Sequence, residues 1–366
     1  MSETLKVVVT GSDGYIGHYL TEKLKDRGHI VTGVDGLIRR ELMTRFGFIS
    51  AIPYEMNYKW LIDLSNPGHY YPLKEVLQKT RPDVIFHLAH IPAPTYSMLD
   101  AEKAVRTQTN NIASNLFLYW AVKEVNPEIP IIQIGTLGEF GYSKLGRIHD
   151  GLSFVEQERM ADGSLYHISK NQMTLNAKYL ANLWGLRVVD IQQTVVEGAR
   201  ENCPLWFDWV TGTVVNRIMC QAIAGEILRY GSGNQKRSFL SLEDSVNALL
   251  TVMEHVDEVQ GYLSVNQFDP NSILSINEVI QIVLDVAGEH GLEPEVKNIP
   301  NPRVEREDNE VDVEFTILPS WGFKPKKTVE EEIKDSFPLL LEHKDRIQRY
   351  AHTIEPKPVM GWRRWR

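Results

Sequence analysis

Hydrophobic positions in the first half of the chain fall into short continuous runs and into longer stretches with helical spacing. The continuous runs lie at residues 5–11, 29–35, 82–89, 130–136 and 186–194. Such runs predict strands that are covered on both faces. Helical spacing is seen at residues 15–27, 101–125 and 166–184. Buried strands that alternate with helices predict an α/β domain with a doubly wound parallel sheet.

After about residue 195 the pattern loosens and predicts a smaller mixed α/β lobe. Helices are expected at residues 212–223, 243–255 and 275–289, and a strand at 260–266. We expect two parts, which are residues 1–195 with about 237–266, and residues of about 196–236 with 267–366. The first would be the cofactor-binding domain and the second the substrate-binding lobe.

Composition and charge narrow the classes of partner. The net charge is −9, which disfavours nucleic acid as a partner because phosphate binding needs clustered Lys and Arg. The spacing of Cys203 and Cys220 fits neither a zinc site nor a redox pair, so no metal is expected. With few thiols, no signal peptide before the first strand and no apolar run near ~18 residues, we predict a cytoplasmic protein without an integral membrane segment.

The stretch TGSDGYIG (residues 10–17) follows the first predicted strand and opens the first helix. Gly11, Gly14 and Gly17 allow a tight turn and a close approach of the backbone to a pyrophosphate. Asp35 ends the second strand, where a carboxylate binds the cofactor ribose and favours NAD over NADP. This predicts a Rossmann NAD site, although Arg39 and Arg40 keep NADP as a second option.

Other predicted cofactor contacts come from the same loop and from the ends of neighbouring strands. They are Asp13, Tyr15, Ile16, Asp63, Leu64, Leu88 and Ala89. Asp63 is placed to reach the adenine, and a solvated loop carboxylate is the alternative interpretation.

The stretch SLYHISK places Tyr166 and Lys170 one helical turn apart. Residues at i and i+4 share one helix face, so the Lys170 cation would lower the pKa of the Tyr166 phenol. The pair would then act as the base that takes the proton of a substrate alcohol while its carbon gives hydride to the cofactor. Both residues are therefore predicted to contact the cofactor and the substrate.

Thr136, Tyr166 and Lys170 in this order resemble the catalytic set of the extended short-chain dehydrogenase/reductases that act on nucleotide sugars. Thr136 ends the preceding strand and would bond the reacting oxygen, and Asn111 matches the family's helix asparagine near the cofactor. The 4,6-dehydratases of that superfamily carry an Asp-Glu pair after the threonine. Leu137 and Gly138 stand there in this chain, which disfavours an ordinary 4,6-dehydratase.

The chain is most similar to the UDP-sulfoquinovose synthase family. The matching stretches are VDGLIRR (34–40), TYSMLDAEKAV (95–105), QTNN (108–111), GTLGEFG (135–141), YHISK (166–170), VVNR (214–217), VNQF (265–268) and NPRVE (301–305). The resemblance implies NAD, oxidation of the sugar 4-hydroxyl, loss of the 6-hydroxyl, addition of sulfite and return of the hydride. It also implies acid/base or sulfite-side roles for Glu139 and His167.

The same resemblance implies a set of nucleotide-binding residues. Arg237 and Arg303 would bind the pyrophosphate, since guanidinium groups form paired hydrogen bonds with phosphate. Glu305 would hold ribose hydroxyls, and Asn216 and Arg217 would contact the nucleotide diphosphate. The substrate would be a nucleotide sugar, and we expect a homodimer.

Two departures from the family fall near the sugar end of the site. The family has an arginine where this chain has Pro92 in HIPAPT (90–95), and a tyrosine where it has Glu197. An anionic sulfur donor would need that arginine. Four alternatives therefore stay open: a 4-epimerase of UDP-glucose or UDP-glucuronate, a sulfite-independent dehydratase, a net dehydrogenase or reductase, and a non-catalytic NAD-binding protein.

Overall fold

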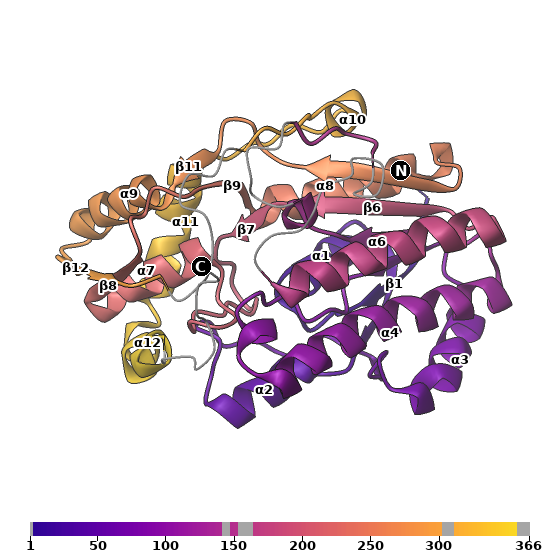
Figure 1. The fold of residues 1–366 in the computed structure, drawn as a ribbon, viewed down its shortest axis with the longest axis horizontal. Coiled ribbons are helices and arrows are strands. Elements are labelled where there is room, and N and C mark those ends of the chain that lie inside the picture. Colours follow the sequence, from indigo (N-terminus) through magenta and orange to yellow (C-terminus); the bar gives the residue numbers. More distant parts are fainter. Residues whose placement is uncertain (1–2, 141–146, 153–163, 302–310, 357–366) are drawn as a thin grey trace, which may run out of the picture.

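The computed structural model describes residues 3–140, 147–152, 164–301 and 311–356. A seven-stranded parallel sheet of order β10-β6-β5-β4-β1-β2-β3 forms its largest layer (Figure 1). The strands are β1 (Lys6–Thr10), β2 (Ile30–Asp35), β3 (Trp60–Leu61), β4 (Val84–His87), β5 (Ile131–Ile134), β6 (Val188–Gln193) and β10 (Tyr262–Gln267).

Helices cover both faces of this sheet. One face carries α1 (Tyr15–Asp26) and α8 (Leu242–His255), and the other carries α3 (Tyr70–Thr80), α4 (Ala101–Val125) and α6 (Leu165–Trp184). In β1 the side chains of Val7 and Val9 enter the first layer and that of Val8 enters the second. The three central positions of the strand are apolar because both of its faces are buried there.

A further group of helices forms the core of a second packed region. Helices α7 (Val214–Ala224), α9 (Ile276–Glu289), α11 (Val329–Leu341) and α12 (Lys344–Arg349) share one hydrophobic core. Two small sheets accompany them, β11-β9-β7 and β12-β8. Their strands are β7 (Val195–Glu197), β8 (Glu226–Tyr230), β9 (Lys236–Ser241), β11 (Ile273–Ser275) and β12 (Glu295–Ile299). The short helices are α2 (Ile38–Phe46), α10 (Ile317–Ser320) and the 3-10 turns η1 (Pro67–His69), η2 (Tyr96–Met98), η3 (Leu137–Phe140), η4 (Val256–Glu258) and η5 (Ala351–Thr353).

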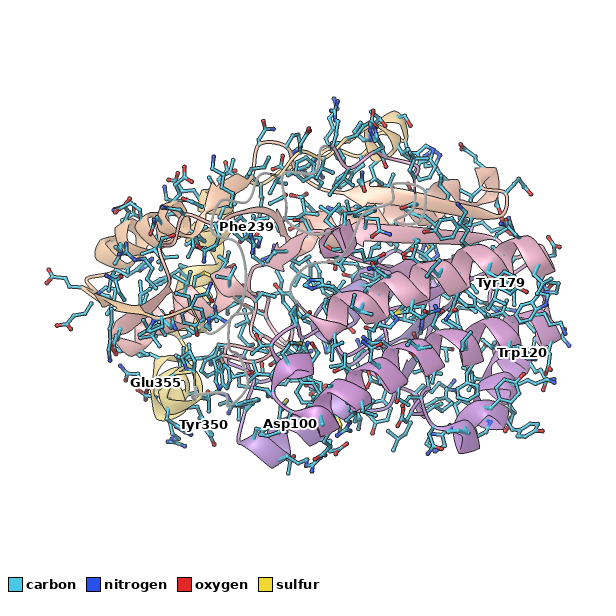
Figure 2. The ribbon with its side chains drawn as sticks, in the orientation of Figure 1. Asp100, Trp120, Tyr179, Phe239, Tyr350 and Glu355 are labelled. Carbon is cyan, nitrogen blue, oxygen red and sulfur yellow. The ribbon has the colours of Figure 1, made fainter. Side chains whose placement is uncertain are left out.

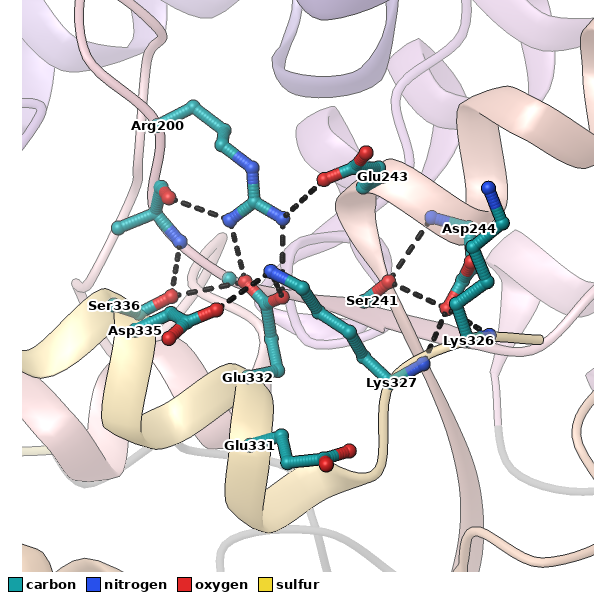
Figure 3. A network of polar contacts seen from close by, with 12 residues as sticks. Arg200, Ser241, Glu243, Asp244, Lys326, Lys327, Glu331, Glu332, Asp335 and Ser336 are labelled. Carbon is teal, nitrogen blue, oxygen red and sulfur yellow. Dashed lines mark hydrogen bonds and ion pairs between the residues drawn. The ribbon is translucent and has the colours of Figure 1, made fainter.

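A mostly buried ion pair joins two elements of this second region, and a glutamate of α8 from the large-sheet layers lies beside it (Figure 3). Arg200, which follows β7, donates two hydrogen bonds to Glu332 of α11, at 2.6 and 3.0 Å. Glu243 of α8 lies 3.7 Å from the same guanidinium, and Lys327 lies 3.5 Å from Glu332. Gly198 leaves room for this carboxylate, because a Cβ there would stand 1.8 Å from a Glu332 oxygen.

The predicted α/β architecture is confirmed by the parallel sheet. Each predicted strand and helix of the first half is present, with ends shifted by at most two residues. The strand expected at 260–266 is β10, which pairs with β6 at the edge of the large sheet. The assignment of residues to two domains stays a prediction.

Candidate functional site

A cavity of about 830 Å³ runs along the carboxyl ends of the parallel strands. Residues that follow five of these strands line it, namely Gly11, Asp35, Leu88, Thr136 and Thr194. From there the cavity extends to α7, β8 and β9 in the second region. Ligands of doubly wound sheets bind at this edge, so the cavity is the candidate site.

The glycine loop has the close packing that the sequence predicts. Gly11 has a φ of +77°, and a Cβ on it would stand 2.7 Å from the Leu88 backbone. A Cβ on Gly17 would stand 2.1 Å from the Gly11 oxygen, so the first turn of α1 can lie this close only with glycine there. Gly14 is the N-cap of α1 and offers no side-chain cap. The first N–H groups of α1 therefore face the cavity as an anion site.

The cavity lining includes most of the predicted cofactor residues. They are Gly11, Asp13, Gly14, Tyr15, Ile16, Gly17, Asp35, Arg39, Arg40, Asp63, Leu64, Leu88 and Ala89. The Tyr15 hydroxyl donates to the Gly198 carbonyl at 2.5 Å, which joins the loop to the end of β7.

Asp35 lies where a ribose-binding carboxylate is expected. Its oxygens accept hydrogen bonds from the backbone N–H of Asp13 at 2.9 Å and of Leu37 at 2.7 Å. Burial raises its pKa, and these two hydrogen bonds oppose the shift. Arg40 is paired with Asp13 at 2.6 Å, and Arg39 packs over the Trp206 ring. Both arginines thus have local partners, which favours the NAD interpretation over the NADP option.

Asn111 does not line the cavity, contrary to the expected cofactor contact. Its side-chain oxygen accepts from the Ile91 N–H at 2.8 Å, and its amide donates to Ser169 at 2.9 Å. Asn111 therefore connects the segment after β4 to α6, and it helps to position the residues of the site without lining the cavity itself. The neighbouring Asn110 faces the cavity in its place.

Thr136, Tyr166 and Lys170 all line the cavity. Ser164 caps α6 by accepting from the His167 N–H, which puts Tyr166 in the first turn of the helix. The Tyr166 N–H donates to Ser97 at 3.0 Å, so the start of this helix is held from two sides.

Lys170 is buried beneath the cavity. Its ammonium lies 5.9 Å from the Tyr166 ring centre and donates to the Ile134 carbonyl at 2.5 Å. Burial lowers the pKa of Lys170, while the charges of Glu139 and Asp190 raise it. The cation therefore lies close enough to stabilise a Tyr166 phenolate, as the spacing in the sequence predicts.

The two further acid/base candidates lie in different places. His167 lines the cavity, with its ring 5.1 Å from that of Tyr166 and its Nδ1 2.9 Å from the Ser164 hydroxyl. Glu139 is fully buried and is not part of the lining. The turn η3 directs its carboxylate into the core, where it accepts from the Thr174 hydroxyl at 2.7 Å. Direct contact of Glu139 with the substrate is therefore not supported.

His90 was not predicted and is the closest side-chain partner of Lys170 among the described residues. It lines the cavity, and its Nδ1 lies 3.1 Å from the Lys170 nitrogen. Because an ammonium has only donors, Nδ1 must be the acceptor and the imidazole must be neutral. Burial lowers the pKa of His90 well below its usual value, in agreement with this. The sequence signal that could have identified His90 as a site residue is its position shortly after the apolar strand β4.

The far end of the cavity holds a buried cation with free donors. Arg217 is 4% exposed, and its Nε and Nη1 have no hydrogen-bond partner among the described residues. Its guanidinium lies over the Tyr230 ring at 4.8 Å. The Tyr230 hydroxyl, Gln235 Oε1 and Ser238 Oγ nearby are likewise buried without a partner in the described parts of the chain. A ligand that carries both anionic oxygens and hydroxyl or N–H donors would satisfy these groups, because Gln235 Oε1 needs a donor.

Two of the other predicted substrate residues line the cavity, and two lie outside the residues that the structure describes. Arg237 and Asn216 line the cavity, and the Asn216 side chain accepts from the Gly198 N–H at 2.9 Å. Arg303 and Glu305 lie outside the described residues.

Comparisons with known proteins agree with this geometry. The sequence model of the NAD dependent epimerase/dehydratase family matches residues 7–266. UDP-sulfoquinovose synthase of Sulfolobus acidocaldarius is 35% identical, over 98% of each chain. The chloroplastic UDP-sulfoquinovose synthase of Spinacia oleracea is 28% identical over 98% of this chain and 79% of its own.

Among solved structures, UDP-glucuronic acid 4-epimerase of Bacillus cereus has a TM-score of 0.72 at 18% identity. The match covers 92% of this chain and 99% of that one. The UDP-glucose 4-epimerase of Thermotoga maritima has a TM-score of 0.71 at 20% identity, over 93% and 99% of the two chains. These likenesses show the shared fold.

Proposed function

Because the chain belongs to the NAD dependent epimerase/dehydratase family, we propose that it converts a UDP-sugar through a transient 4-ketone. It is an NAD-dependent nucleotide-sugar enzyme of the extended short-chain dehydrogenase/reductase type. The observation that carries the proposal is one continuous cavity. It joins the glycine loop, the Thr136, Tyr166 and Lys170 set, and the buried Arg217.

The residues present fit NAD at one end of this cavity. The glycine loop offers backbone N–H groups to a pyrophosphate, and Asp35 offers acceptors to a ribose. When bound, NAD supplies the hydride acceptor for a sugar carbon. Arg217 at the other end would pair with the sugar nucleotide's diphosphate, because its free donors suit phosphate oxygens.

Tyr166 takes the proton from the sugar 4-hydroxyl in this proposal. The Lys170 cation stabilises the phenolate, and the Thr136 hydroxyl bonds the same sugar oxygen. His167, which lines the cavity beside Tyr166, is the candidate for moving the proton at carbon 5. Glu139 no longer fits that task, because its carboxylate is enclosed in the core.

The likeness to UDP-sulfoquinovose synthases favours a path in which carbon 5 loses its proton, the 6-hydroxyl leaves and sulfite adds. The second candidate is a 4-epimerase or a dehydratase without sulfite. Pro92 favours it, because this proline lines the cavity where the synthase family has an arginine. A sulfite dianion would lose a matched cation there.

Turnover in deuterated water separates the candidates. We would incubate the protein with UDP-glucose and with UDP-glucuronate, with and without sulfite, and analyse the products by mass spectrometry and NMR. Elimination through carbon 5 predicts deuterium at carbon 5, because the 4-ketone acidifies that position. A sulfonated sugar formed only with sulfite supports the synthase reaction. Turnover without deuterium at carbon 5 would reject elimination and leave the 4-epimerase.

We also propose a homodimer built on the outer faces of α4 and α6. Large apolar side chains are exposed there, including Val105 at 64%, Tyr179 at 64%, Leu183 at 55% and Trp120 at 46%. Figure 2 shows Trp120 and Tyr179 at the same end of these two neighbouring helices. These side chains support the proposal, because large exposed apolar patches occur at protein–protein interfaces.

Location is predicted only from composition. The described parts of the chain contain no helix long and apolar enough to cross a membrane. Cys203 and Cys220 are free and buried. A cytoplasmic location stays a prediction.

A further inference from the structure

The Thr174 hydroxyl on α6 lies between two buried carboxyl groups. Its oxygen is 2.7 Å from Glu139 Oε2 and 2.8 Å from Asp190 Oδ2. Glu139, Asp190 and Thr174 are each fully buried. Asp190 is on β6, so the three groups join η3, α6 and the large sheet directly below the end of β5.

Counting hydrogens limits the charge of this group. A threonine hydroxyl has one hydrogen, so it can donate to only one of the two carboxyl groups. Two ionised carboxylates would leave the other contact as oxygen against oxygen, which is costly in a dry core. At least one carboxyl must therefore be protonated and donate to the Thr174 oxygen. The pair then carries at most one negative charge, and a cation buried nearby would require that charge as its counterpart.

The surroundings leave one cation to balance that charge. The titratable groups around the pair are Lys170 on α6, Tyr119 on α4, Tyr262 on β10, and His87 and His90 at the end of β4. Tyr262 donates to Asp190 Oδ2 at 2.8 Å, and Tyr119 donates to Gln133 at 2.5 Å. Burial raises the pKa of both phenols, so they stay neutral.

The two histidines are also neutral. His87 is fully buried, and burial lowers its pKa to about 3. His90 accepts from Lys170, which requires the uncharged ring. Lys170 is thus the charged partner that the described residues supply to the pair.

We propose that Glu139, Thr174 and Asp190 form a proton-sharing unit that holds one negative charge beneath Lys170 and keeps this lysine in its ammonium form. The unit also positions Thr136, whose N–H lies 3.2 Å from Glu139 Oε1. Its effect on turnover rests on the proposed function. Glu139 and Asp190 are positioning residues here, since neither lines the cavity.

The pKa shifts of the two carboxyl groups agree with a shared proton. Burial raises the pKa of Glu139, and the neighbouring Asp190 raises it further. Burial also raises the pKa of Asp190. Gly135 allows the Asp190 side chain to lie close to the backbone after β5, because a Cβ at this position would stand 2.8 Å from Asp190 Oδ1.

Infrared difference spectra test the shared proton without any substrate. We would compare the purified protein at neutral pH with Glu139→Gln, Asp190→Asn and, as a control, the exposed Glu330→Gln. The expected result is a carboxylic acid C=O band in the native protein that each core substitution removes. The band disappears in both because the remaining carboxyl ionises opposite Lys170. The control should keep the band.

Two results would overturn the shared proton. One is a native protein without a band that either core substitution removes. The other is a band that persists in Glu139→Gln, because Asp190 would then be protonated by itself. Glu139→Gln alone decides the matter if Asp190→Asn does not fold.

The pH dependence of turnover tests the effect on Lys170. Each single substitution keeps one negative charge. The pH at which turnover falls on the alkaline side, here called the alkaline limb, should therefore stay within about 0.3 pH units of its value in the native protein. The double variant Glu139→Gln/Asp190→Asn removes the charge, and the limb should move down by about one pH unit or more. A merely structural role would lower turnover at every pH without moving the limb, and would overturn the proposal. Absence of nucleotide-sugar turnover in the native protein would instead refute the proposed function, while the infrared result would still decide the shared proton.

Discussion

Tyr166 is the side chain on which the proposed proton transfer depends. Replacing it with Phe keeps the ring in place and removes the hydroxyl. We expect turnover to fall by at least about 100-fold, since a positioned acid/base group contributes this much. NAD affinity should stay nearly unchanged, because the glycine loop and Asp35 are untouched. Isothermal titration with NAD and a product assay measure the two effects, and native-like turnover would remove Tyr166 from the mechanism.

Asp35 is the residue on which cofactor choice depends. Asp35→Ala removes both ribose acceptors and the negative charge that repels a 2′-phosphate. We expect weaker NAD binding and a smaller preference for NAD over NADP. Titration of both cofactors into protein stripped of nucleotide is the measurement. An unchanged ratio of the two dissociation constants would mean that another group reads the ribose.

The positions of single residues could be predicted where their spacing along a helix determines which face they share. Tyr166 and Lys170 line the same cavity because positions four apart share a helix face. The acid/base role predicted for Glu139 stays a prediction without structural support, because η3 places its carboxylate in the core, against Thr174, and outside the cavity lining. His90 and Thr174 were missed, because their partners lie far away in the sequence and become neighbours only in the fold.

At the scale of elements, the Arg200–Glu332 ion pair joins the end of β7 to α11 within the second region. Glu332→Gln would leave Arg200 without its matched carboxylate in a mostly buried setting. We expect a loss of about 3 kcal/mol in the free energy of unfolding. The control Glu330→Gln breaks an exposed pair with Lys334 on the same helix and should cost less than about 0.5 kcal/mol. Equal losses in urea unfolding would contradict this role.

The outer face of α6 is the second element-scale test. Tyr179→Glu puts a charge on the proposed dimer face and should shift the protein toward the monomer. Tyr71→Glu is the matched control, because Tyr71 is 76% exposed on α3, outside that face. Sedimentation velocity measures the association state. A dimer that survives Tyr179→Glu, or a native protein that is monomeric, would reject this interface.

Elements could be predicted where the hydrophobic period was strong. The buried runs of β1, β2, β4, β5 and β6 and the long helices α4 and α6 were all evident from the sequence. The three-residue strands β7 and β11 and the exposed strand β12 were missed. A strand this short or this exposed has no hydrophobic period, and its position is set by pairing with a distant strand.

At the scale of the whole molecule, the proposed reaction requires one cavity that holds a cofactor and a sugar nucleotide together. The large sheet supplies the glycine loop and Thr136, α6 supplies the acid/base residues, and α7 supplies Arg217. The proposed reaction is redox-neutral, because the hydride removed from the sugar returns to it before the product leaves. This distinguishes the proposal from a net dehydrogenase, which exchanges its reduced cofactor with solution.

The most direct measurement follows a deuterium placed at carbon 4 of the UDP-sugar substrate. After many turnovers, NMR of the product and absorbance of the released cofactor show where the label went. We expect the deuterium to return to carbon 4 of the product sugar and free NADH not to accumulate. Deuterium found in free reduced cofactor, in amounts that match the product, would contradict the redox-neutral account and make the protein a net dehydrogenase.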